Sequence, residues 1–199
     1  MTGPFRLGLT GSIGMGKTTT AQMFAEAGVP VWDADATVHA LYAPGGAAVA
    51  PIAAAFPGVV VEGAVDRSRL RESLGADKAA LSRLESIVHP LTTAARQAFL
   101  ERHAGADLVV LDIPLLFETG AEQGCDAVLV VTAPPEVQRR RVLERGTMSE
   151  AQFEQILARQ MPDAEKRARA QHIIETRTLE ETRAAVHKLI GTLRGGRHA

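Results

Sequence analysis

Eight consecutive residues near the start of the chain have the types and spacing of a phosphate-binding loop. Residues 11–18 fit the pattern G-x-x-x-x-G-K-S/T in full. Glycines allow the backbone to surround a phosphate with its N–H groups, the Lys17 ammonium reaches the β- and γ-phosphates, and the Thr18 hydroxyl binds Mg²⁺. We therefore predict a site for a nucleoside triphosphate with Mg²⁺. The predicted contacts are Gly11, Ser12, Ile13, Gly14, Met15, Gly16, Lys17, Thr18 and Thr19.

This loop is shared by GTPases, mechanical ATPases and small-molecule kinases, and two sequence features separate them. A GTPase normally reads guanine with an Asn-Lys-x-Asp loop, and the chain contains no asparagine. An ATPase motor usually places a glutamate after its Walker-B aspartate, but Asp112 is followed by Ile113 and Pro114. An agent that activates water is therefore not evident, and the pattern favours a kinase.

Two carboxylates, Asp33 and Asp35, follow the short apolar run at residues 29–32. In an open parallel sheet the carboxyl end of a strand opens onto the ligand crevice, near the phosphate loop. A kinase places Mg²⁺ and an acceptor hydroxyl there, and both can use carboxylates. Aspartate is also a common N-cap of a helix, so a capping role remains open for each residue.

Alternating strands and helices must position these groups. Strands are predicted at residues 5–10, 29–32, 108–113, 127–132 and 172–174. Helices are predicted at residues 18–27, 136–145, 149–160 and 178–193. The runs at 108–113 and 127–132 are apolar throughout, which is typical of a parallel sheet covered on both faces. The sequence therefore predicts an α/β fold, a three-layer doubly wound parallel sheet of about five strands. From residue 37 to about 105 strand patterns nearly vanish, which indicates a helical insertion.

The composition excludes several other classes. With 22 Lys and Arg against 23 Asp and Glu, the net charge of -1 gives no general attraction to nucleic acid or to an anionic membrane. No apolar run is long enough to cross a bilayer, and the first residues lack the pattern of a secretory signal. The single cysteine, Cys125, excludes an internal disulfide, so we expect a reducing, cytoplasmic environment. Nothing in the sequence indicates an oligomeric state.

Four motifs in order resemble the dephospho-coenzyme A kinase family, over about residues 5–190. They are the loop at 9–18, Asp33-Ala34-Asp35, His89-Pro90-Leu91, and Pro114-Leu115-Leu116-Phe117-Glu118. The resemblance implies a fold like that of nucleoside monophosphate kinases. It also implies transfer of the ATP γ-phosphoryl group to the 3'-hydroxyl of dephospho-CoA, the last step of coenzyme A biosynthesis. A core at about residues 1–36, 106–138 and 171–199, an acceptor-binding helical insertion at 37–105 and a lid at 139–170 would follow.

The resemblance also implies roles for individual residues. Lys17, Asp35 and Arg141 would be catalytic, with Asp35 orienting the 3'-hydroxyl and Arg141 neutralising charge on the transferring phosphoryl group. Arg145 and Arg159 would be further lid arginines. The acceptor pocket would be formed by Asp33, Asp35, His89, Pro114, Leu115, Leu116 and Phe117. For the last three, plain core packing is an equal alternative.

The chain departs from the family pattern before and after its last predicted strand. The family usually has Ala-Asp before this strand and an asparagine after it, where this chain has Ala170-Gln171 and Thr176. A hydroxyl offers one donor where an amide offers both donor and acceptor groups, so the contact near adenine would change. Two alternatives remain: a kinase of another nucleotide-like acceptor, and a regulatory module that binds a nucleotide without turnover.

Overall fold

The computed structural model describes residues 3–195. The chain forms two compact units, one of Met1–Trp32 with His103–Ala199 and one of Asp33–Arg102. The sequence predicted a helical insertion at 37–105, and the second unit begins four residues earlier and ends three residues earlier than that range. Within the described residues, no helix is both long enough and apolar enough to span a bilayer.

A five-stranded sheet forms the centre of the first unit. Its strands are β1 (Phe5–Thr10), β2 (Val31–Asp33), β5 (Leu108–Asp112), β6 (Ala127–Thr132) and β7 (His172–Glu175), in the order β2-β5-β1-β6-β7. β1 pairs in parallel with both β5 and β6, and β6 pairs in parallel with β7. The predicted five-stranded α/β sheet is thereby confirmed. The phosphate loop follows β1. The connection that leaves β1 leads toward one edge of the sheet, and the connection that leaves its neighbour β6 leads toward the other. Ligands bind at such a switch point.

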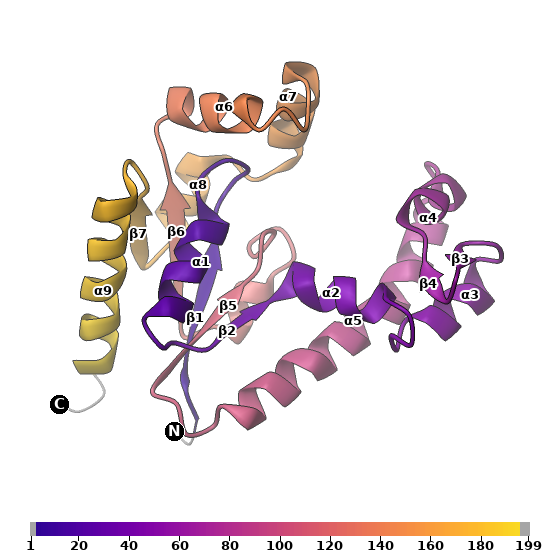
Figure 1. Ribbon diagram of the computed structural model, residues 1–199, viewed down its shortest axis with the longest axis horizontal. Helices are drawn as coiled ribbons and strands as arrows, with labels where there is room; N and C mark the ends of the chain where they lie inside the picture. Colours follow the sequence, from indigo (N-terminus) through magenta and orange to yellow (C-terminus); the bar gives the residue numbers. More distant parts are fainter. Residues whose placement is uncertain (1–2, 196–199) are drawn as a thin grey trace. The chain divides into compact units, whose positions relative to one another are not determined.

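Helices cover both faces of this sheet. α1 (Lys17–Glu26) packs beside α9 (Leu179–Gly195), and together they bury one face through side chains such as Phe24 and Val186 (Figure 1). α8 (Asp163–Arg169) packs against β6. Gly8 of β1 allows a close approach, because a Cβ there would lie 2.7 Å from the Cys125 sulfur. α6 (Pro135–Glu144) and α7 (Glu150–Arg159) lie beyond the carboxyl ends of β1 and β6 (Figure 1).

The second unit is mostly helical, as expected. It contains α2 (Ala34–Tyr42), α3 (Val49–Ala55), α4 (Arg67–Leu74) and α5 (Lys78–Arg102). Its own core is formed by buried residues that include Ile52, Phe56, Leu70 and Val88. Pro90 lies inside α5, so His89 is in the interior of a long helix.

Three short elements were not predicted. The hairpin of β3 (Val60–Val61) and β4 (Ala64–Val65) turns at Glu62 and Gly63, which both have positive φ. Two-residue strands are too short to show an alternating pattern. The other two are α8, which is confined between Pro162 and β7, and a 3-10 turn, η1 (Ala121–Gly124).

Candidate active site

The phosphate loop takes a shape that requires its glycines. Gly14 and Gly16 have φ values of 77° and 88°, in the left-handed region that disfavours side chains. A Cβ on Gly14 would also lie 2.6 Å from a methyl group of Val142. α1 begins at Lys17, so its positive dipole end faces the loop. Inside the loop the Ser12 hydroxyl is buried and has no hydrogen-bond partner among the described residues, which fits a ligand rich in acceptors.

Lys17 is paired with an aspartate that sequence reasoning left outside the site. The Lys17 Nζ lies 2.6 Å from Oδ1 of Asp112, whose side chain is 3% exposed. Asp112 ends β5, and the parallel register of β1 with β5 places it opposite Leu9, just before the loop. The available signal was the position of Asp112 at the end of an apolar strand. The pairing itself depends on which strands are neighbours.

The residues present fit a magnesium ion bound together with nucleotide phosphates. Thr18 lies exposed in the first turn of α1, and Asp112 supplies a carboxylate beside Lys17. No group of three or more His, Cys, Asp or Glu side chains in residues 3–195 could hold a metal by itself. Mg²⁺ at phosphate sites usually takes only one or two protein ligands and completes its shell with phosphates and water.

Arg141 is held at the end of β7. Its guanidinium donates to the Thr176 Oγ1 at 2.9 Å and to the carbonyl oxygens of Thr176 and Arg177. The Thr176 hydroxyl in turn donates to the Met15 carbonyl of the phosphate loop at 2.8 Å. Burial, followed by the nearby charges of Arg140 and Arg145, lowers the pKa of Arg141. The threonine that replaces the family's asparagine therefore joins the phosphate loop to α6.

A cavity of about 280 Å³ lies next to this arginine. It is lined by Gly16, Thr19, Arg141, Arg145, Thr176, Arg177, Thr178, Leu179 and Thr182. Two of the three predicted lid arginines thus border one cavity at the start of α1. The third, Arg159, is exposed at the end of α7. Arg139 and Arg140 instead form ion pairs with Glu150 and Glu144.

Gln171, the other departure from the family pattern, lies at the amino end of the parallel strands, whereas the phosphate loop lies at their carboxyl end. It precedes β7, where its side chain accepts a hydrogen bond from the Val128 backbone at 2.8 Å. The phosphate loop follows the carboxyl end of β1, and β7 runs in the same direction through β6. The contact of Gln171 is with the sheet backbone.

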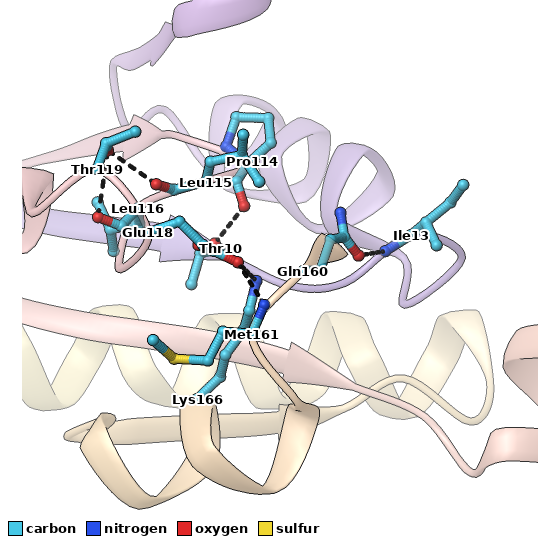
Figure 2. A network of polar contacts seen from close by, with 10 residues as sticks. All are labelled: Thr10, Ile13, Pro114, Leu115, Leu116, Glu118, Thr119, Gln160, Met161 and Lys166. Atoms are coloured by element: carbon cyan, nitrogen blue, oxygen red, sulfur yellow. Dashed lines mark hydrogen bonds and ion pairs between the residues drawn. The ribbon is translucent and has the colours of Figure 1, made fainter. Parts of the chain in front are cut away.

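The loop after β5 contains both buried and exposed members of the predicted acceptor pocket. Leu116 is completely buried and Phe117 is 7% exposed, so the structure favours core packing for these two. Leu115 is 43% exposed and is available to a ligand. The Pro114 carbonyl accepts a hydrogen bond from Thr10 Oγ1, which ties the loop to β1 (Figure 2).

The remaining predicted acceptor residues belong to the second unit. Asp33 caps α2, because its Oδ1 accepts from the Ala36 N–H at 2.9 Å. The capping alternative for Asp33 is thus confirmed. Asp35 lies exposed in the first turn of the same helix, and His89 is exposed on α5.

Comparison with known proteins places these features in one family. The family described as dephospho-CoA kinase matches residues 5–181. A dephospho-CoA kinase of Cereibacter sphaeroides is 66% identical over 191 residues, which cover 96% of each chain. Among solved structures, TT1252 from Thermus thermophilus is 35% identical with a TM-score of 0.85, covering 96% of this chain and 97% of that one. The dephospho-CoA kinase from Campylobacter jejuni is 25% identical with a TM-score of 0.70, covering 96% and 98%. The chain belongs to the dephospho-CoA kinase family.

Proposed function

We propose that this kinase transfers the γ-phosphoryl group of ATP to the 3'-hydroxyl of dephospho-CoA. The products are ADP and coenzyme A, so the reaction is the last step of coenzyme A biosynthesis. The observation that carries the proposal is an intact phosphate loop, with Lys17 at its end, in a chain that belongs to this family over 5–181. We place the reaction in the cytoplasm, with ATP and dephospho-CoA as the small-molecule partners.

In this proposal the ATP phosphates lie in the loop of residues 11–18, and Lys17 exchanges Asp112 for phosphate oxygens. The cavity beside Thr176 and Arg141 receives the nucleoside end of ATP. Its volume of about 280 Å³ lies just below the range of about 300 to 1,000 Å³ that is typical of ligand pockets. Arg141 is already oriented there by three carbonyl and hydroxyl oxygens, so little side-chain freedom is lost when ATP binds.

Thr18 and Asp112 would hold Mg²⁺ together with the phosphates. When bound, the ion offsets the negative charge of the phosphates. Release of Asp112 from Lys17 provides the carboxylate when the ammonium moves to the phosphates. Without a nucleotide, the ion pair therefore keeps the Lys17 ammonium and the Asp112 carboxylate together at the place where the nucleotide and its Mg²⁺ would bind.

We propose Asp35 as the group that orients the 3'-hydroxyl and accepts its proton as the new O–P bond forms and the bond to ADP breaks. Phosphoryl transfer has a loose transition state, so the role of this carboxylate is mainly positional. Asp33 supports it by fixing the first turn of α2. His89 and the exposed Leu115 contribute to acceptor binding, and Arg145 and Arg159 act with Arg141 as lid cations.

ADP release with and without dephospho-CoA tests the proposal. We expect ADP formation to depend on dephospho-CoA and on Mg²⁺, and to be lost in Lys17→Ala. ATP hydrolysis of equal rate without the acceptor would contradict a transferase. ATP binding with no turnover on any acceptor would favour a regulatory nucleotide-binding module.

A further inference from the structure

A polar network joins three segments of the first unit that are distant in sequence (Figure 2). They are the phosphate loop, the loop that follows β5, and residues 160–166, which run from the end of α7 into the first turn of α8. Its members include an ion pair between Glu118 and Lys166 and a hydrogen bond between Gln160 and Ile13. Neither of these two contacts has a role in the chemistry proposed above.

The ion pair lies in the interior. Lys166 is completely buried, and its Nζ lies 2.9 Å from Oε1 of Glu118, whose side chain is 19% exposed. The same carboxylate oxygen accepts a hydrogen bond from the Met161 N–H at 2.9 Å. Burial acts to raise the pKa of Glu118, but the ion pair with Lys166 and the hydrogen bond from the Met161 N–H outweigh it, and the net pKa is lowered. Glu118 therefore stays charged at neutral pH and holds both ends of the segment 161–166.

The residue before this segment reaches the phosphate loop. The Gln160 carboxamide oxygen accepts a hydrogen bond from the Ile13 N–H at 3.1 Å, and Gln138 of α6 donates to the Ile13 carbonyl at 2.7 Å. Both polar groups of the Ile13 backbone are thus bound by glutamines from outside the loop. Because Gly14 and Gly16 give the neighbouring backbone little rigidity of its own, these contacts help to set the shape of the loop.

Hydrophobic packing does little to fix the position of α7 itself. Of the ten residues of this helix, all within the described part of the chain, only Phe153 is buried. A cavity of about 980 Å³ is bordered by α6, α7 and α8, by Met15 of the phosphate loop and by Gln160 of the network. The position of Gln160 must therefore be set mainly by the polar contacts on its C-terminal side.

A buried ion pair is a poor source of stability, because desolvation of both charges offsets most of their attraction. Its geometry, in contrast, is restrictive: one carboxylate oxygen contacts both the ammonium and a backbone N–H. We infer that Glu118 and Lys166 are positioning residues for phosphoryl transfer, which fix residues 160–166 so that Gln160 holds the phosphate loop at Ile13. The inference rests on the proposed binding of ATP by this loop.

Two variants separate positioning from simple support of the fold. The double variant Glu118→Gln/Lys166→Met removes both charges without leaving either one buried and unpaired. Gln160→Met removes only the carboxamide oxygen that accepts the hydrogen bond from the Ile13 N–H, at a half-buried position. For each we expect Kd and KM for ATP to rise, and kcat to fall, by about tenfold, since small misplacements of reacting groups are costly. KM for dephospho-CoA should stay within about twofold of wild type.

A matched control is the ion pair between Arg6 and Asp126, 2.7 Å apart at the amino ends of β1 and β6, away from the phosphate loop. The double variant Arg6→Met/Asp126→Asn should change the melting temperature without changing Kd for ATP or the kinetic constants. Combining Gln160→Met with Glu118→Gln/Lys166→Met, the charge-free pair, should add little further loss of ATP affinity or of kcat. Both changes act through the one contact between Gln160 and Ile13. Fully additive effects would mean independent roles and would contradict the inference.

Calorimetric titration of each folded variant with ATP gives a result that does not depend on the acceptor. An unchanged Kd for ATP in Gln160→Met would contradict the positioning role. An unchanged Kd in the charge-free pair, together with a lowered melting temperature, would show that the network only supports the fold. If the charge-free pair does not fold, Gln160→Met alone decides. A wild-type protein that binds ATP but forms no coenzyme A would refute the proposed function, whereas the comparison of ATP affinities would still test the positioning role.

Discussion

Lys17, the first residue of α1, and Asp112, the last residue of β5, form an ion pair of 2.6 Å at the phosphate loop. Asp112 is nearly inaccessible to solvent, and the Lys17 ammonium contacts its carboxylate directly. In the proposed mode of ATP binding, Lys17 contacts the phosphates instead and the Asp112 carboxylate becomes available to Mg²⁺. Loss of Lys17 therefore affects both catalysis and stability.

Lys17→Ala should abolish most phosphoryl transfer and also lower the stability of the fold. Removing one partner of a buried ion pair destabilises the fold by about 3 kcal/mol, because the remaining charge stays buried. The additional change Asp112→Asn should recover much of this stability without recovering activity. ADP formation and thermal unfolding measured on the single and double variants check both parts. Activity of Lys17→Ala within a few-fold of wild type would contradict the assignment of the loop.

Asp35→Asn should preserve ATP binding and reduce kcat by roughly 10² to 10⁴, the range for a positioned acid–base group. Asp33→Asn should be milder, because asparagine caps a helix about as well as aspartate. Asp33→Ala should cost about 1 kcal/mol of stability through loss of the cap. Steady-state kinetics and denaturant titration distinguish these effects. Normal turnover of Asp35→Asn together with an inactive Asp33→Asn would reverse the two roles.

Thr176→Val keeps the shape of the side chain but removes the hydroxyl that joins Met15 to Arg141. We expect KM for ATP to rise by about tenfold, since each lost hydrogen bond to a charged group is worth about 1.5 kcal/mol or more. Thr176→Ser retains the hydroxyl and serves as the control. Equal KM values for ATP in Thr176→Val and wild type would show that Arg141 is positioned without this contact.

The stability of the protein should fall in acid partly through Glu118. Its pKa in the folded state lies below the ordinary value of 4.5. A lowered folded pKa contributes stability that is present above the unfolded value and is lost as pH falls through the folded value. Between pH 7 and 3 the melting temperature of wild type should therefore decrease more steeply than that of Glu118→Gln/Lys166→Met. Parallel curves for the two proteins would show that the ion pair does not contribute to acid sensitivity.

The sequence predicted the sheet because its long strands are continuous apolar runs that end at glycine, aspartate or proline. The phosphate loop was equally visible, since its chemistry lies in eight consecutive residues. Lys166 was not visible: it lies in the charged run 163–169, which has the composition of an exposed helix, and only the packing of α8 on β6 buries it. The pairing of Lys17 with Asp112 was missed for a related reason, because it depends on the strand order and not on any local pattern.

Identification of the phosphorylated product decides which acceptor the enzyme uses. Purified protein should be incubated with Mg²⁺, ATP and either dephospho-CoA, AMP, CMP, UMP or adenosine, and the products separated and identified by mass spectrometry. We expect coenzyme A, phosphorylated at the ribose 3'-position, to form far faster than any other phosphorylated product. An equal or faster rate with a simple nucleoside monophosphate would contradict this expectation and indicate a kinase of another nucleotide-like acceptor.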